Sequence, residues 1–138
     1  MSAGHRNRMD PRRELGAAGE RLAARHLEAR GFELVARNFR TRHGELDLVA
    51  CDSRFLVFCE VKTRIVRGDA GPFGPLSSIG THKQRRVRAI AREWLCGPGG
   101  EAACLAEVAP PEIRFDAIGV TFDASGRLLA LEHLEAAF

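Results

Sequence analysis

The sequence lacks long hydrophobic runs and paired cysteines, and these absences exclude several classes of protein. No apolar stretch approaches the roughly 20 residues of a membrane-spanning helix, so we expect no membrane association. The N-terminal segment also lacks the apolar core of a signal peptide, and a cytoplasmic location is the expectation. The four cysteines form no CxxC pair and match no zinc spacing. We therefore expect reduced structural thiols rather than a zinc site.

The residues that are present describe an ordinary globular chain of 138 residues with unevenly distributed charge. Hydrophobic residues make up 45% of the chain and charged residues 28%, which is typical of a soluble protein with one core. The formal net charge is only +3, but arginines gather at the N-terminus, at 37–42 and at 83–92. Such clusters favour an anionic partner. We expect residues 1–11 to form a flexible basic tail and residues 12–138 to form a single domain.

Hydrophobic periodicity predicts helices and strands in the order α-β-β-β-α-β-β. One helix is predicted over 12–30 and another from Thr81 to the motif "GPGG". Thr81 and Gln84 have the spacing of an N-terminal capping box. Short turns favour hairpins, and a helix between strands favours a parallel crossover, so the expected sheet is mixed and flanked by helices. Its five predicted strands are 32–40, 45–50, 55–62, 112–122 and 127–134.

Four charged residues interrupt the apolar strands of "GELDLVACDSRFLVFCEVK". A two- or four-residue turn at "CDSR" would place Glu45 opposite Glu60 and Asp47 opposite Phe58. Because side chains alternate along strands, Glu45, Asp47, Glu60 and Lys62 would share one face, with Asp47 and Glu60 as diagonal neighbours. Two carboxylates so placed suit Mg²⁺ or Mn²⁺. A solvated salt-bridge face on an edge hairpin explains the same charges equally well.

Glu20 supplies a further carboxylate on the first predicted helix. Its neighbours one turn away are Gly16, Ala17, Ala23 and Ala24, so it has no ion partner within the helix. Small neighbours would let this helix lie close to the sheet and direct Glu20 toward the same ion. An exposed surface glutamate is the alternative.

The motif pair "GELDLVA" and "FCEVKTR" resembles the Asp, then Glu-x-Lys core of the PD-(D/E)xK nuclease superfamily. More closely, residues 14–138 resemble the YraN family of small endonuclease-like bacterial proteins. Segments that carry this resemblance include "LGAAGERLAARHLEARGFELVARNFRTRHGELDLVA", "HKQRRVRAIAREWL" and "IRFDAIGV". The resemblance implies a restriction-endonuclease-like α/β/α sandwich with a mixed five-stranded sheet.

The resemblance also implies a metal-dependent endonuclease that hydrolyses phosphodiester bonds in DNA, branched or structured DNA included. Asp47 and Glu60 would bind Mg²⁺ or Mn²⁺, and Lys62 would assist the attacking water. The alternative is a nucleic-acid-binding module that keeps the nuclease fold with little or no turnover. The oligomeric state stays open, a homodimer included.

Three further residues belong to the candidate site through the same resemblance or their position. Glu20 matches the helical acidic residue of archaeal Holliday-junction resolvases, which are relatives in the superfamily, and would be a third metal ligand. Gln84 lies in the family's Lys-Gln segment and would support the site, as would Glu45. We expect Asp116, which is acidic within a strand, to form structural hydrogen bonds rather than to bind metal.

Basic residues on the second predicted helix form the expected nucleic-acid surface, because only Glu93 opposes them there. Such residues contact phosphates and position a nucleic-acid backbone without reading its sequence. A solvated basic helix face is the alternative. The expected nucleic-acid-binding residues are Lys83, Arg85, Arg86 and Arg88 of this helix, together with Arg42, which precedes the acidic hairpin.

Overall fold

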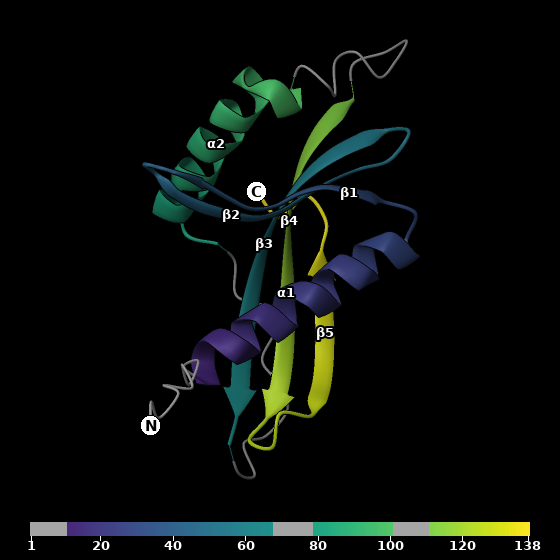
Figure 1. Ribbon diagram of the computed structural model, residues 1–138, viewed down its shortest axis with the longest axis vertical. Coiled ribbons are helices and arrows are strands. Elements are labelled where there is room, and N and C mark those ends of the chain that lie inside the picture. Colours follow the sequence, from purple (N-terminus) through teal and green to yellow (C-terminus); the bar gives the residue numbers. More distant parts are fainter. Residues whose placement is uncertain (1–10, 68–78, 101–110) are drawn as a thin grey trace, which may run out of the picture.

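The computed structural model describes residues 11–67, 79–100 and 111–138, and its elements follow the predicted order (Figure 1). The expected basic tail lies outside these residues except for Pro11, which begins the first helix. No helix of the described ranges is long and apolar enough to cross a membrane. The elements are α1 (Pro11–Ala29), β1 (Glu33–Thr41), β2 (Gly44–Cys51), β3 (Phe55–Val66), α2 (Thr81–Cys96), β4 (Glu112–Asp123) and β5 (Leu128–Leu134).

The strands form one mixed sheet in the order β1-β2-β3-β4-β5. Tight turns join β1 to β2, β2 to β3 and β4 to β5, and each of these pairs is antiparallel. The pair β3 and β4 is parallel, because α2 and its connections carry the chain back across the sheet. The predicted mixed five-stranded sheet is therefore confirmed.

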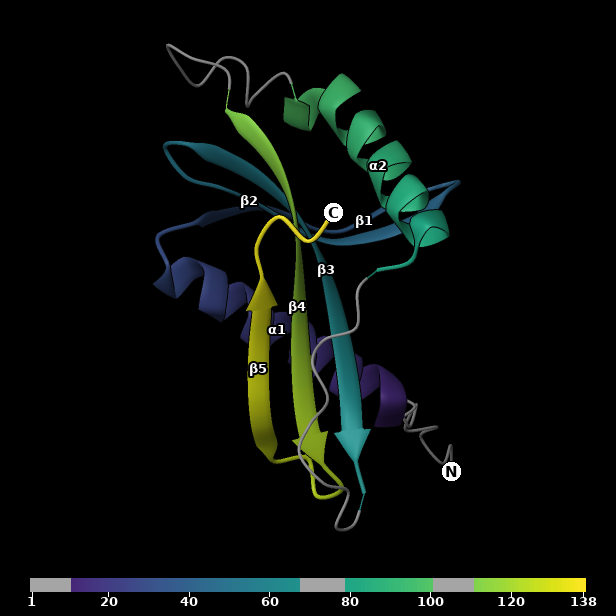
Figure 2. The ribbon, with the colours of Figure 1, turned by 180° about the vertical axis from the view of Figure 1, so that it is seen from behind.

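The helices cover opposite faces of the sheet, as the two opposed views show (Figures 1 and 2). Successive side chains of β3 point to opposite faces of the sheet and so pack in both cores. Val57 and Cys59 pack in the core under α1 with Leu27, whereas Leu56 and Phe58 pack in the core under α2. The layered α/β/α arrangement expected from the sequence is thus confirmed. On β3, residues an even number of positions from Phe58 face α2.

Helix α1 approaches β3 closely at Gly19. A Cβ atom at this position would collide with the side chain of Thr63, so glycine is required for the approach. Ala23 and Ala24, on the next turn, are fully buried against the sheet. The small residues around Glu20 therefore have the effect that the sequence predicted.

The predicted capping box at the start of α2 is wrong. Gly80 is the N-cap residue, and no side chain caps the helix. The Gln84 side-chain amide donates instead to the carbonyl oxygen of Ile79 at 2.7 Å. Extended backbone at Gly80 moves the helix start by one residue relative to the predicted cap, which removes Thr81 from the capping position.

The predicted register of the β2–β3 hairpin is also wrong. Leu48 pairs with Cys59, and Cys51 pairs with Leu56. The cause lies in the turn, where Asp52 Oδ1 accepts hydrogen bonds from the backbone of Arg54 at 2.8 Å and Phe55 at 2.6 Å. These bonds move the pairing by two residues. The alternation of side chains on β2 also breaks at Asp47, because Leu46 packs under α2 and Leu48 under α1. The predicted common face for Glu45, Asp47 and Glu60 is therefore wrong, since Glu45 and Asp47 gather with Glu20 of α1 and Glu60 faces α2.

Asp116 on β4 is fully buried and has the structural role expected of it. Its carboxylate accepts hydrogen bonds from Arg114 at 2.8 and 2.9 Å and from the backbone of Ala136 at 3.0 Å. It also lies 2.8 Å from His133 on β5, whose ring contacts His26 of α1 at 3.0 Å. Burial raises the pKa of Asp116, but the hydrogen bonds outweigh this effect, and the pKa is lowered.

Candidate functional site

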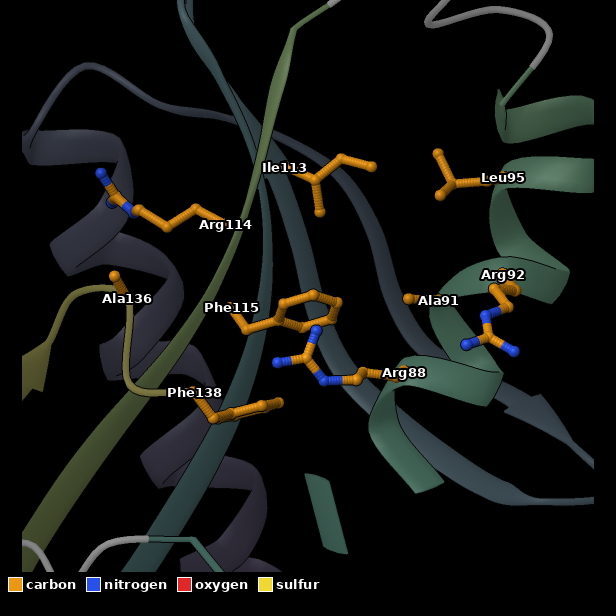
Figure 3. A pocket seen from close by; sticks show the side chains of 9 residues that line it. All are labelled: Arg88, Ala91, Arg92, Leu95, Ile113, Arg114, Phe115, Ala136 and Phe138. Atoms are coloured by element: carbon orange, nitrogen blue, oxygen red, sulfur yellow. The ribbon is translucent and has the colours of Figure 1, made fainter. Parts of the chain in front are cut away.

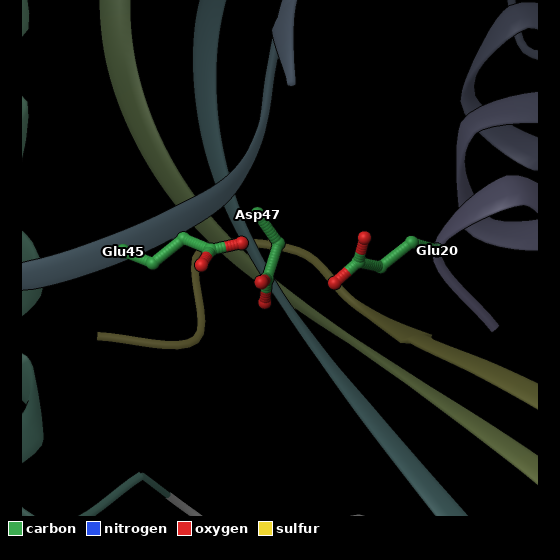
Figure 4. A group of neighbouring side chains, drawn as sticks. All are labelled: Glu20, Glu45 and Asp47. Atoms are coloured by element: carbon green, nitrogen blue, oxygen red, sulfur yellow. The ribbon is translucent and has the colours of Figure 1, made fainter. Parts of the chain in front are cut away.

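Three carboxylates converge where α1 meets β2. Glu20 comes from α1, Glu45 and Asp47 come from β2, and each offers an oxygen within 4.8 Å of the other two (Figure 4). All three are half-buried. A set of carboxylate oxygens at this spacing suits a hard divalent cation such as Mg²⁺ or Mn²⁺. The structure thus brings Glu20 to Asp47 of the hairpin and groups Glu45 with them, whereas the predicted ligand Glu60 lies outside this group.

Asp47 lies in the opening between β2 and β3. The backbone N–H of Val61 donates to Asp47 Oδ2 at 2.7 Å, while the pairing of the two strands ends at Leu48 and Cys59. Backbone N–H groups of a strand point along the plane of its sheet. The Asp47 carboxylate therefore replaces the missing strand partner of Val61 instead of projecting from one face beside Glu60.

Asn38 is a site residue that the sequence analysis missed. It has a left-handed backbone conformation with φ of 49°, which asparagine tolerates better than most residues. With its amide nitrogen turned toward the carboxylates, it donates to Glu20 Oε2 at 3.0 Å and to Glu45 Oε1 at 2.6 Å. The only signal in the sequence is an asparagine inside the strand "FELVARNFR". Asn38 links the carboxylates of α1 and β2.

Crowding and burial make the cluster costly to charge. The pKa of Asp47 is raised to about 7, first by burial and then by the charges of Glu60, Glu20 and Glu45, against the hydrogen bond from Val61. The pKa of Glu20 is raised as well, first by burial and then by Glu45, although hydrogen bonds to Asn38 and Asp47 oppose the change. A bound cation or proton would relieve this repulsion.

Glu60 lies on the α2 side of the sheet and is only 7% exposed. Lys83 of α2 places its Nζ 2.6 Å from Glu60 Oε1. The second oxygen, Oε2, is buried and has no hydrogen-bond partner among the residues that the structure describes. Glu60 is not part of the 4.8 Å group, yet its charge contributes to the raised pKa of Asp47. A buried carboxylate oxygen without a donor is an acceptor that a water molecule or an ion would satisfy.

The remaining predicted site residues have different surroundings. Lys62 follows Glu60 by two residues on β3, so strand alternation places it on the same side of the sheet. Gln84 is bound through its side-chain nitrogen to Ile79, at the start of α2. Lys62 therefore lies on the face that carries Glu60, whereas Gln84 stabilises the entry to the helix.

A cavity of about 160 Å³ lies beside the carboxylates. Glu20 and Asn38 form part of its wall together with Arg21 and Arg37. Its size admits several water molecules, and its polar lining would hydrogen-bond them. Water and a small anionic group therefore have access to the α1 side of the cluster.

Among the predicted nucleic-acid-binding residues, two lie close to a carboxylate of the protein and three form no ion pair with the described residues. Lys83 contacts Glu60, and Arg42 lies 4.0 Å from Glu93. Within the described ranges, no ion pair involves the other three, which are exposed along α2. These three residues are Arg85, Arg86 and Arg88.

Comparison with known proteins places these residues in a family context. The model of a family described as "Uncharacterised protein family UPF0102" matches residues 19–120, which include all four carboxylates. The chain is 44% identical to a UPF0102 protein of Anaeromyxobacter dehalogenans, over 100% of this chain and 93% of that protein. It is 42% identical to one of Rhodococcus jostii over 90% of this chain and 95% of that protein, and 40% identical to one of Geobacter metallireducens over 91% and 93%.

Proposed function

The chain belongs to the uncharacterised protein family UPF0102, the YraN family, and we propose that it is a metal-dependent endonuclease that hydrolyses phosphodiester bonds in DNA. The observation that carries the proposal is the convergence of Glu20, Glu45 and Asp47, whose central member also experiences the charge of Glu60. Burial and mutual repulsion at such a cluster are typical of functional sites, where structural stability alone would disfavour them.

The donor atoms fit Mg²⁺ or Mn²⁺. All of them are carboxylate oxygens, which hard cations prefer, and no histidine or cysteine belongs to the group. Glu20, Glu45 and Asp47 would hold the ion. Glu60 lies outside this group, and its Oε2, which has no hydrogen-bond partner among the described residues, would be a further ligand. When bound, such an ion supplies an activated water and stabilises the charge that develops on the phosphate.

The chain's own residues supply the remaining requirements. The pKa of Asp47 is about 7, so its carboxyl loses its proton when the pH rises above this value or when a bound cation offsets the neighbouring negative charges. Lys62 provides a positive charge beside Glu60, where it would orient the water or stabilise the phosphate. Lys83 neutralises Glu60 Oε1 and so limits the repulsion between Glu60 and Asp47.

The unpaired arginines of α2 support DNA as the substrate. α2 packs on the same side of the sheet as Glu60, and Arg85, Arg86 and Arg88 are exposed along it. Exposed guanidinium groups on one helix would contact phosphates of a nucleic-acid backbone. We extend the proposal to branched or structured DNA on the strength of the resemblance to junction resolvases.

A nucleic-acid-binding module with little or no turnover is the second candidate. The contact between Lys83 and Glu60 favours it, because a carboxylate held by lysine at 2.6 Å is less available to a cation. The two candidates share the DNA surface and differ in whether Glu60 functions as a metal ligand.

Cleavage of labelled linear, flapped and four-way DNAs, with Mg²⁺ or Mn²⁺ and with chelator, tests the proposal. We expect metal-dependent cleavage that Glu60→Gln abolishes and Lys62→Ala reduces, with DNA affinity largely kept in both variants. Equal cleavage by wild type and both variants would identify a contaminating nuclease. Binding without cleavage by any of the three would instead support the binding module.

A further inference from the structure

A second cavity, of about 440 Å³, lies between α2 and β4 (Figure 3). Arg88 and Arg92 project from α2 on one side, and Phe115 and Phe138 form a floor on the other. Ile113 adds an apolar wall that is 49% exposed. The cavity thus combines an accessible apolar surface with two guanidinium groups.

The floor is a column of stacked planar groups. The rings of Phe58 and Phe115 lie 5.7 Å apart at 28°, and those of Phe115 and Phe138 lie 5.1 Å apart at the same angle. The Arg88 guanidinium lies over both outer rings, 4.8 Å from the centre of the Phe115 ring and 5.7 Å from that of Phe138. Aromatic rings and guanidinium planes are the surfaces on which proteins stack unpaired bases.

The charge of the cavity is not compensated within the described part of the chain. Neither Arg88 nor Arg92 forms an ion pair with the residues described there. Arg114 also lines the cavity, but its guanidinium binds Asp116 and turns away from the space. Two arginines without ion pairs among the described residues, beside stacked rings, suit a ligand that is both planar and anionic, and a nucleotide is both.

The cavity is adjacent to the proposed catalytic face. Phe115 of β4 pairs with Phe58 of β3, and Ala117 pairs with Glu60. Phe115 and Glu60 therefore lie on neighbouring strands and on the same face of the sheet. Two residues along a strand span about 6.5 Å, which is comparable to one step of an extended nucleic-acid strand. A nucleotide in the cavity would therefore lie on the same face of the sheet as Glu60, about one nucleotide step from it.

We propose that this cavity binds one unpaired nucleotide of the DNA strand, with its base stacked on the Arg88–Phe115 column and its phosphate bound by Arg92. The inference rests on the proposed function and specifies its substrate class. A base inside a duplex cannot reach such a floor without leaving its stack. The preferred substrates are therefore strands with unpaired nucleotides, such as single strands, flaps and opened junctions.

Fluorescence of 2-aminopurine in short single-stranded DNA tests the inference in chelator, where no cleavage occurs. We expect quenching on binding to wild type, because the probe stacks, and weaker binding of a duplex of equal length. Arg88→Lys keeps the charge but removes the plane, so it should abolish most quenching and weaken single-strand binding about tenfold. Arg25→Lys, an exposed arginine on α1 across the sheet, is the matched control and should behave as wild type.

The outcomes separate this inference from the proposed function. DNA binding with equal quenching in wild type and Arg88→Lys, or with no preference for single strands, would overturn the cavity assignment alone. Absence of binding to every DNA would contradict the DNA substrate and the cavity assignment together. Loss of quenching in Arg88→Lys with an unchanged salt dependence would support stacking on this column.

Discussion

At the scale of single residues, Asp47 links the stability of the protein to pH. Its carboxyl has a pKa of about 7 in the fold and an ordinary value near 3.8. The folded state therefore holds a proton between these values that the unfolded state has lost. This contribution to stability is complete below about pH 4 and is lost as the pH rises to 7.

We expect Asp47→Asn to remove this dependence. In chelator, the free energy of unfolding of the variant relative to wild type should rise by about 2 to 4 kcal/mol between pH 4 and 7. Denaturant unfolding at several pH values measures the difference. The lowered pKa values of Asp116 and His26 make stability increase with pH in both proteins, so their contribution cancels in the difference between variant and wild type. Parallel curves for the two proteins would contradict the raised pKa.

Asn38 offers a test of how the carboxylates are held in place. Asn38→Gly removes the amide while keeping a residue that accepts φ of 49°. We expect Mn²⁺ affinity to fall about tenfold, as is common when a residue that orients ligands is lost. Titration followed by electron paramagnetic resonance measures it.

Asn38→Ala is the companion variant. It should show the same loss of Mn²⁺ affinity and be about 1 kcal/mol less stable than Asn38→Gly, because its side chain disfavours the left-handed conformation. Wild-type Mn²⁺ affinity in Asn38→Gly would mean that the amide does not support the site.

At the scale of elements, the approach of α1 to β3 depends on Gly19. Gly19→Ala should destabilise the protein by about 1–3 kcal/mol and weaken Mn²⁺ binding, because the helix must move away from Thr63 and carries Glu20 with it. Gly16→Ala is the matched control on the same helix, where an added Cβ meets nothing within 4 Å. It should leave Mn²⁺ binding unchanged and stabilise the helix by up to about 1 kcal/mol. Denaturant unfolding and Mn²⁺ titration distinguish the two variants, and equal effects would show that contact with Thr63 is unimportant.

The exposed arginines of α2 should determine how strongly DNA affinity depends on salt concentration. Replacing Arg85, Arg86 and Arg88 by alanine should weaken DNA binding and reduce the slope of log affinity against log salt by up to about 3, since fewer counterions are released. Fluorescence anisotropy across a salt series measures both quantities. Arg25→Ala together with Arg127→Ala should leave the slope unchanged. An unaltered slope in the α2 variant would identify these arginines as a solvated surface.

The elements themselves could be predicted from the sequence, whereas their contacts could be predicted only in part. Helices and strands follow from apolar spacing, and the mixed sheet follows from turn lengths, so both were correct. The hairpin register depended on hydrogen bonds of Asp52, and the start of α2 depended on the backbone at Gly80, which spacing does not encode. Asn38 was missed because its role requires a left-handed backbone and partners from two elements.

At the scale of the whole molecule, the candidate site joins the two layers of the fold. α1 contributes Glu20, the hairpin contributes Glu45 and Asp47, and Lys83 connects Glu60 to α2. An ion bound here would stabilise the folded state as a unit, by about 2.7 kcal/mol at a hundredfold excess over its Kd. Mn²⁺ should therefore raise the Tm of wild type in a single transition and leave that of Asp47→Asn nearly unchanged, as calorimetry would show. A rise of equal size in both proteins would place the ion elsewhere.

The parallel pairing of β3 with β4 has a consequence for synthesis of the protein on the ribosome. All four carboxylates belong to residues 20–60, so they emerge early, whereas the partner of β3 begins only at Glu112. Until β4 is made, β3 is an open edge with unpaired backbone groups and an apolar sequence, which favours association with other chains. Nascent chains that stall before Glu112 should therefore require chaperones, although every proposed metal ligand has already been translated.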